Sequence, residues 1–168
     1  MSSQNVPGPR DPRLEPWRTF LYAHASIRRQ LERELQAEQG MSMGEYELLL
    51  LLAYSPDRRQ RMSEIADSMV LSRSGATRLI DRLEAQGLVA RVSCDTDRRG
   101  QWAHITPDGY DRLRRAAPTH LRGIAEHFLD RIPAEDLEAL GRILLRVTPE
   151  GEPPPGFRPP DRQPARAG

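Results

Sequence analysis

The stretch that decides the fold is RMSEIADSMVLSRSGATRLIDRLEAQGLVARVSCDTDRRGQWAHIT, residues 61–106. It predicts two short helices joined by a tight turn. Ser63 and Ser72 stand where the two helices begin, and we expect both to be N-caps, because a serine oxygen accepts a free backbone N–H group there. Apolar residues at helical spacing form the buried face of the second helix: Ala76, Leu79, Ile80 and Leu83. Gly87 then ends that helix in the left-handed conformation.

The opposite face of the second helix is polar. It carries Ser74, Thr77, Arg78 and Asp81, with Arg73 and Arg82 at its edges. Hydroxyl groups reach bases or phosphates in a DNA major groove, and guanidinium groups pair with guanine or with phosphate. A surface helix without a DNA partner also turns charged residues outward, so this helix alone leaves both interpretations open.

A β-hairpin is expected directly after the second helix. Residues 88–93 (LVARVS) and 101–106 (QWAHIT) alternate apolar and polar side chains, as half-buried strands do. The loop between them, 94–100 (CDTDRRG), is polar and carries Asp97, Arg98 and Arg99 at its tip. Arginine on a thin hairpin can enter a DNA minor groove, where the negative potential is strong. Asp97 is expected to hold a neighbouring arginine in place, since phosphates repel its carboxylate.

These motifs resemble the winged helix of the MarR family of bacterial transcription regulators. The resemblance rests on Leu-Ser-Arg-Ser at 71–74, Leu-Glu-x-x-Gly-Leu-Val at 83–89, Asp-Arg-Arg at 97–99 and Ile-Thr-x-x-Gly at 105–109, and it extends over about residues 17–147. It implies an obligate homodimer that binds a pseudo-palindromic operator in double-stranded DNA. It also implies that a small aromatic ligand often releases the operator.

The expected fold class is mainly α with a small β-wing, in which N- and C-terminal helices form an intertwined dimerisation domain. The first helix has an apolar stripe from Phe20 to Leu35, and the last has one from Leu137 to Val147, with no sheet to cover either. A monomer with a compact helical cap is the alternative. The expected divisions are a disordered segment (1–15), a helical dimerisation region (16–40 and 107–148), the winged helix-turn-helix (41–106) and a disordered Pro/Arg-rich tail (149–168).

Each candidate DNA contact has an expected role. Ser74, Thr77 and Arg78 reach base edges, and Arg73 divides between base and phosphate. Ser63 and Ser72 contact phosphates from helix starts. Arg99 enters the minor groove, Asp97 braces it and Arg98 takes a phosphate or shares that role.

An effector pocket is expected where the dimer helices meet the winged domain, as the resemblance implies. The candidate contacts are Trp17, Tyr22, His24 and Tyr46, with Arg78 or Asp67 as sources of charge. Each could instead be an ordinary core or structural residue, because tyrosine and tryptophan often pack in cores with one hydrogen bond. A constitutive DNA-binding regulator without a ligand is therefore the alternative.

Net charge is only +1, but it is unevenly distributed. Residues 58–125 contain 13 arginines and 8 acidic residues, whereas the flanking helical regions are acidic. The basic surface thus coincides with the expected winged helix. All 25 basic residues are arginine, so phosphate contacts would come from guanidinium groups.

The single cysteine, Cys94, excludes an internal disulfide and suits a reducing cytoplasm. Regulation through oxidation of Cys94 is a further alternative, against which stands the interpretation that the thiol is incidental. No segment has the apolar length of a membrane span, so we expect a cytoplasmic protein without a membrane partner.

Catalysis is not expected. The histidines, which are His24, His104, His120 and His127, form no HExxH motif, and neither a Gly-rich phosphate loop nor a G-x-S-x-G motif is present. We therefore expect no metal site and no cofactor. A winged helix that only docks proteins is a second alternative, but the face with Ser74, Thr77 and Arg78 lacks the large apolar anchors of such surfaces.

Overall fold

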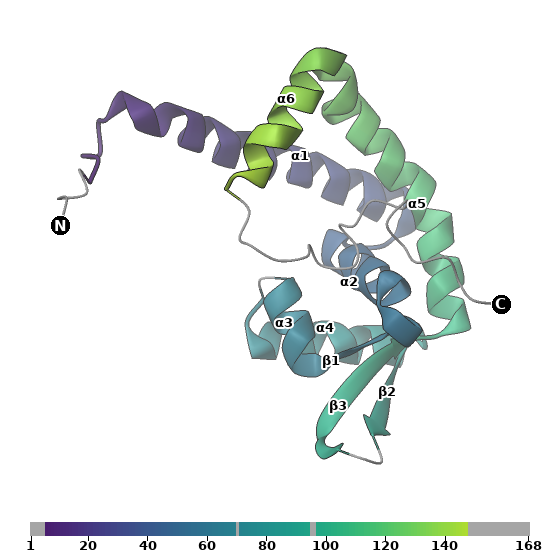
Figure 1. Ribbon diagram of the computed structural model, residues 1–168. Helices are drawn as coiled ribbons and strands as arrows, with labels where there is room; N and C mark the ends of the chain where they lie inside the picture. The colour runs from purple at the N-terminus through teal and green to yellow at the C-terminus, as the bar shows by residue number, and fades with distance from the viewer. Residues whose placement is uncertain (1–5, 70, 95–96, 148–168) are drawn as a thin grey trace.

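A computed structural model of the chain describes residues 6–69, 71–94 and 97–147, except for the side chains of residues 93–100. It is mainly helical with one small antiparallel sheet (Figure 1), which confirms the expected mainly α class with a small β-wing. In chain order the elements are η1 (Pro12–Leu14), α1 (Glu15–Gln39), α2 (Met43–Tyr54), η2 (Pro56–Arg58), β1 (Arg59–Arg61), α3 (Met62–Ser68), α4 (Arg73–Ala85), β2 (Val89–Cys94), β3 (Asp97–Ile105), α5 (Pro107–His127), η3 (Leu129–Arg131) and α6 (Ala134–Leu145).

Helix α2 lies at the centre of the hydrophobic core. Ser42 and Glu45 form a capping box at its start, in which each side chain accepts the other residue's backbone N–H. Leu48, Leu49 and Leu52 are fully buried, because α2 is covered by α1, α4, α5 and the sheet. The run of leucines at 48–52 is thus part of a helix that is buried on most sides.

The winged domain combines α3 and α4 with a sheet in the order β1-β3-β2. Ile65 of α3, Ile80 and Leu83 of α4 and Ile105 of β3 are buried together in its core. Ser72 caps α4, and Gly87 follows the helix with φ of 72°, so both predictions at the ends of this helix are confirmed. The two helices and the wing therefore share one apolar core.

Three details of the winged domain differ from the sequence-based expectations. Ser63 is not an N-cap, because Arg61, the last residue of β1, occupies the cap position of α3, where no side chain caps a backbone N–H group. Strand β1 was not expected, since it pairs with β3 through its backbone and has no apolar alternation. The connection after β2 is shorter than 94–100, because β3 already begins at Asp97.

Helix α5 joins the wing to the outer helices. Thr106 caps it and Pro107 takes its first position. The wing and α6 lie at opposite ends of α5, while α1 packs beside α5 and then projects away from the winged domain (Figure 1). Within the expected disordered segment 1–15, Asp11 caps η1, and the expected tail 149–168 lies outside the described residues.

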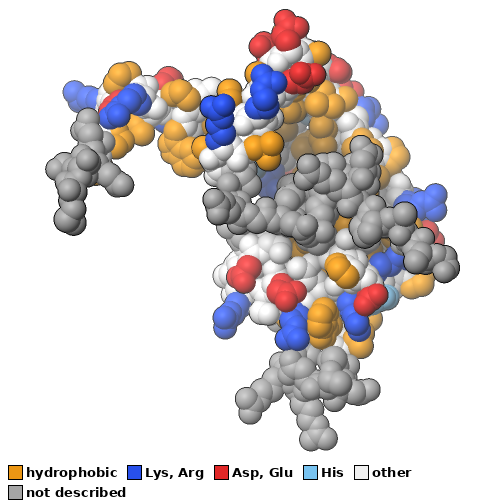
Figure 2. Space-filling model, in the orientation of Figure 1, with side chains coloured by type: hydrophobic (Ala, Val, Ile, Leu, Met, Phe, Trp, Pro, Cys, Tyr) orange, Lys and Arg blue, Asp and Glu red, His pale blue; other side chains and the backbone are white. Residues whose placement is uncertain are grey.

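Apolar side chains remain exposed on the outer helices. The projecting part of α1 shows hydrophobic groups at its surface (Figure 2), and Trp17, Phe20 and Leu21 are all exposed there. Helix α6 has no buried residue. Among the described residues, no helix is both long enough and apolar enough to cross a bilayer.

Candidate nucleic-acid interface

The outward face of α4 presents the polar groups that the sequence predicts. Arg73, Ser74, Thr77 and Arg78 are all exposed, whereas Leu79 and Ile80 are buried behind them. Neither Arg73 nor Arg78 contacts an acidic side chain among the described residues, so both guanidinium groups are available to a ligand.

Hydrogen bonds within α4 fix the role of its hydroxyl groups. Thr77 Oγ1 donates to the carbonyl oxygen of Arg73 at 2.9 Å, so this hydroxyl can only accept a hydrogen bond from a ligand. Ser72 Oγ accepts the N–H of Gly75 at 3.1 Å and lies 3.2 Å from Ser74 Oγ. The positive end of α4 thus coincides with two exposed serines, an arrangement suited to a phosphate oxygen.

Ser63 lies in a different setting from Ser72. It is exposed in the first turn of α3, and its hydroxyl caps no backbone group there. Its position near a helix start keeps it a candidate phosphate contact. The two serines therefore differ in how they support the fold, although the sequence presents them alike.

Salt bridges connect α4 to α2 on one side and to β2 on the other. Arg82 Nη1 of α4 lies 3.6 Å from Glu45 Oε1 at the start of α2. On the other side, Arg91 of β2 contacts both Asp81 and Glu84 of α4. These contacts neutralise acidic groups beside the outward face, and the sequence alone did not predict that Glu45 would pair with Arg82 or Arg91 with Asp81 and Glu84.

The wing extends beyond α4 as a two-stranded ribbon (Figure 1). The side chains of Asp97, Arg98, Arg99 and Cys94 lie outside the described residues, so their expected roles remain predictions. At the base of the wing, the guanidinium carbons of Arg59 and Arg61 each lie 5.1 Å from the centre of the Trp102 ring. Sequence reasoning missed this basic sheet face, because β1 itself was not expected.

The four candidate effector residues occupy two separate places. Trp17, Tyr22 and His24 are exposed on the projecting part of α1, where the Phe20 ring stacks between the rings of Trp17 and His24. Tyr46 is buried instead, and its ring centre lies 4.3 Å from that of His120 on α5. A single chain therefore brings the three α1 residues onto one helix and places Tyr46 against a histidine that was not among the candidates.

The Tyr46–His120 contact is neutral at ordinary pH. Burial raises the pKa of Tyr46 to about 12. Burial also lowers the pKa of His120, although the nearby Glu47 carboxylate partly opposes this effect. The Nδ1 atom of His120 is buried and has no hydrogen-bond partner in the part of the chain that the structure describes. This pair forms an uncharged, partly unsatisfied polar spot between α2 and α5.

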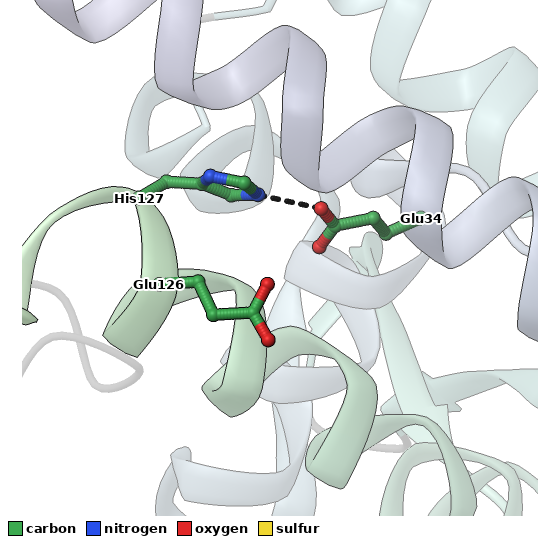
Figure 3. A group of neighbouring side chains, drawn as sticks. All are labelled: Glu34, Glu126 and His127. Carbon is green, nitrogen blue, oxygen red and sulfur yellow. Dashed lines mark hydrogen bonds and ion pairs between the residues drawn. The ribbon is translucent and has the colours of Figure 1, made fainter.

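One group of side chains has donor types that could hold a metal ion. The ligand atoms of Glu34, Glu126 and His127 all lie within 4.8 Å of one another (Figure 3). His127 Nε2 is 2.5 Å from Glu34 Oε1, so this contact links α1 to α5, whereas Glu34 Oε2 is buried without a hydrogen-bond partner among the described residues. The group therefore serves as a polar link between the two helices.

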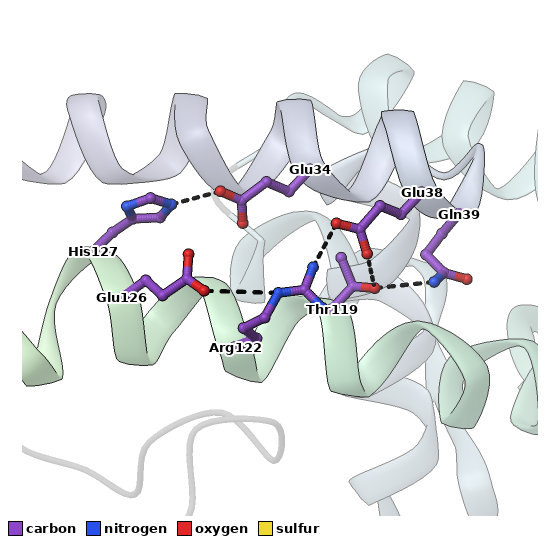
Figure 4. A network of polar contacts seen from close by, with 7 residues as sticks. All are labelled: Glu34, Glu38, Gln39, Thr119, Arg122, Glu126 and His127. Atoms are coloured by element: carbon purple, nitrogen blue, oxygen red, sulfur yellow. Dashed lines mark hydrogen bonds and ion pairs between the residues drawn. The ribbon is translucent and has the colours of Figure 1, made fainter.

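Further polar contacts continue this link along α1 and α5 (Figure 4). Arg122 contacts Glu38 at 2.5 Å, and Thr119 donates to the same carboxylate at 3.0 Å. Gln39 in turn donates to Thr119 at 3.0 Å. The position of α1 is thus fixed on α5, the helix that begins at the wing.

Comparisons with known proteins agree with this geometry. A MarR family model matches residues 39–100. The crystal structure of Sco3205, a MarR family transcriptional regulator from Streptomyces coelicolor in complex with DNA, is 35% identical with a TM-score of 0.75, covering 89% of this chain and 97% of that one. The HTH-type transcriptional regulator MhqR of Bacillus subtilis is 30% identical over 125 residues, 74% of this chain and 83% of MhqR. The HTH-type transcriptional repressor YetL of the same organism is 27% identical over 115 residues, 67% of this chain and 69% of YetL.

Proposed function

Because the chain belongs to the MarR family of transcriptional regulators, we propose that it represses transcription as a homodimer on a pseudo-palindromic operator and that a small aromatic or phenolic ligand releases it. DNA-binding regulation, rather than catalysis, is the activity of this family. The operator symmetry, the dimer, the repressor role and the ligand are the proposal. The following observations support its parts.

The observation that carries the proposal is the outward face of α4. Two arginines without an acidic partner among the described residues, Arg73 and Arg78, flank the hydroxyls of Ser74 and Thr77 on one exposed helix face. Arginine forks and hydroxyl acceptors are the groups that read base edges in the major groove. We assign base contacts to Ser74, Thr77 and Arg78 and a mixed base and phosphate role to Arg73.

The remaining DNA contacts follow from position. Ser63 and Ser72 lie at helix starts, where the helix dipole favours a phosphate. Arg98 and Arg99 belong to the wing, which continues beyond α4 in the direction away from α6. We assign Arg99 to the minor groove, with Asp97 bracing it and Arg98 on a phosphate.

A homodimer would cover the exposed apolar faces of the outer helices. Trp17 is 56% exposed on α1, and Ile143 and Leu145 are 56% and 74% exposed at the end of α6. Large apolar side chains gathered on a surface mark a protein interface, and obligate dimers bury about 2,000 Å² or more. A two-fold axis through these helices would place two copies of α4 about 34 Å apart, one turn of DNA.

The repressor role and the ligand have separate support. YetL, a relative of this chain, is named as a transcriptional repressor. For the ligand, the buried Nδ1 atom of His120 beside Tyr46 offers a hydrogen bond to a phenolic hydroxyl. Trp17, Tyr22 and His24 would join such a pocket only if a second chain brings its α1 there.

Ligand binding is tested by a thermal-shift screen with salicylate-like and phenolic compounds. A compound that raises the melting temperature and lowers DNA affinity supports release by a ligand. No shift across the panel makes the protein a constitutive DNA-binding regulator. Unchanged DNA affinity after peroxide treatment excludes the alternative of control through Cys94.

DNA binding is tested on the promoter that neighbours the gene, first by footprinting and then by titration of the protected duplex. Replacing Arg78 with alanine should cost about 1–3 kcal/mol of binding free energy and relax the preference at one base position. Arg29→Ala is the matched control, because Arg29 is exposed on α1 away from α4. Binding by Arg78→Ala that equals that of the parent chain would contradict the assigned contact.

A further inference from the structure

One residue of the wing contacts helix α4 through both its backbone and its side chain. Arg91 of β2 donates its backbone N–H to Glu84 Oε1 at 3.1 Å. Its guanidinium group contacts the other oxygen of Glu84 and also Asp81 Oδ1. Asp81 and Glu84 are three residues apart on α4, so they lie on neighbouring turns of one face. We call these three residues the Arg91 clamp.

The clamp joins the two parts of the surface that would contact DNA. Helix α4 and strand β2 are also joined by the short turn at Gly87, where φ is 72°, and by the apolar core that they share. In the register of the sheet, Arg91 lies opposite Ala103, which is fully buried, so its side chain leaves β2 on the face toward α4. The clamp therefore fixes the angle between the wing and α4 at a point beyond that turn.

The clamp also changes the charge that α4 presents. Asp81 lies on the polar side of α4, with half of its side chain exposed (53%). Acidic groups in the last turns of a helix stand near its negative end and, beside DNA, near phosphates. The single guanidinium of Arg91 contacts both carboxylates, so it offsets part of this unfavourable charge.

Resting on the proposed function, we propose that Arg91 is a positioning residue for DNA recognition, which holds the wing at the angle where Arg99 and the face of α4 reach adjacent grooves together. A wing that is already oriented loses less conformational entropy when it binds. The clamp acts on affinity rather than on global stability, because partly exposed ion pairs add little to folding free energy.

The test uses Arg91→Lys in the full chain, with the operator duplex as probe. Lysine keeps the positive charge but cannot contact two carboxylates as a planar fork does. We expect operator affinity to fall about tenfold, with little change in melting temperature. A variant that binds as tightly as the parent chain would show that charge alone is required and would overturn the proposal.

A double-mutant cycle with Arg99→Ala separates positioning from direct contact. If Arg91 acts through the wing, Arg91→Lys should weaken binding far less in a chain that already lacks the Arg99 guanidinium. Losses that multiply in the double variant would mean that Arg91 acts independently of the wing tip, which contradicts a positioning role.

Replacing the acidic partners of Arg91 gives a second test, because simple electrostatics and the clamp predict opposite changes in DNA affinity. Removing acids near DNA strengthens binding through simple electrostatics, whereas opening the clamp weakens it. We expect the double variant Asp81→Asn, Glu84→Gln to bind the operator less tightly, and equal or tighter binding would overturn the proposal. If the parent chain binds no duplex, the proposed function fails; if the parent binds and these variants behave otherwise, only the clamp fails.

Discussion

The hydroxyl of Thr106 donates to the carbonyl oxygen of Gly87 at 2.8 Å, which ties the start of α5 to the end of α4. The same hydroxyl oxygen accepts the backbone N–H of Gly109 at 3.0 Å, and the N–H of Thr106 donates to the carbonyl of Leu88. Since α5 also carries the contacts to α1, the placement of α4 depends on the helices that we assign to the dimer. A movement of α5 would reach α4 through this junction.

Gly109 provides the first prediction. A Cβ atom at this position would lie 2.0 Å from the carbonyl oxygen of Leu88 and 2.9 Å from Ile105 Cγ1, and the closer of these is backbone. Gly109→Ala should therefore lower the melting temperature and weaken DNA binding, because α5 must move away from the wing. Thermal unfolding followed by circular dichroism measures the change.

Gly141→Ala is the matched control for this prediction. Gly141 lies inside α6, and a Cβ there meets nothing within 4 Å. Alanine at an open helical site should stabilise the chain by about 0.4–1 kcal/mol. Similar destabilisation by both variants would contradict the tight junction at Gly109.

Ser63 and Ser72 should contribute differently to the unfolding free energy of the chain. Ser72 caps α4, so Ser72→Ala should cost about 1 kcal/mol of unfolding free energy. Ser63 caps no helix, so Ser63→Ala should leave the unfolding free energy unchanged within about 0.5 kcal/mol. Chemical denaturation of the two variants makes the comparison. An equal loss in both would mean that Ser63 also has a structural role.

Stability should fall in mild acid because of His120. Burial lowers the pKa of His120, so the unfolded chain takes up a proton near pH 6.5 while the folded chain does so only at lower pH. Stability is therefore fully present above about pH 6.5 and is lost as the pH falls toward the folded pKa, with a slope of at most about 1.4 kcal/mol per pH unit.

Replacement of the histidine tests this dependence. His120→Phe keeps a ring against Tyr46 but cannot titrate, so its stability should vary less between pH 7 and pH 5. Tyr46→Phe retains His120 and should keep the slope of the parent chain. An unchanged slope in His120→Phe would assign the acid sensitivity to other groups.

The proposed dimer should depend on the apolar face of α1. Phe20 is 45% exposed, and Phe20→Asp places a charge where a second chain would bury it. We expect this variant to be monomeric by mass photometry and to lose operator affinity. Tyr54→Asp changes a similarly exposed ring (46%) on α2 and should stay dimeric. A parent chain that is monomeric would refute the dimer itself.

Features that depend on a few neighbouring residues could be predicted from the sequence. The cap of α4 by Ser72, the left-handed Gly87 and the start of α5 at Thr106 each follow from local hydrogen bonding or backbone geometry. The exposed face of α4 followed from helical periodicity in the same way. Ser63 shows the limit of such reasoning, because a preceding strand moved the cap to Arg61.

Features that depend on distant residues could not be predicted. Strand β1 exists through pairing with β3, about 40 residues further along the chain. The contact of Tyr46 with His120 and the Arg91 clamp likewise require the folded arrangement of α2, α4, α5 and β2. No local pattern in the sequence identifies these partners, because their spacing is set by tertiary packing.

Selection of bound duplexes from a random DNA pool by the full chain at modest ionic strength tests the central claim most directly. The account predicts an enriched, two-fold symmetric sequence whose half-sites are centred about one helical turn, roughly 10 bp, apart. In the same selection, Arg78→Ala should lose preference at one position in each half-site. A pool without enrichment, or a single unpaired half-site, would contradict recognition by a dimer that presents α4 to successive major grooves.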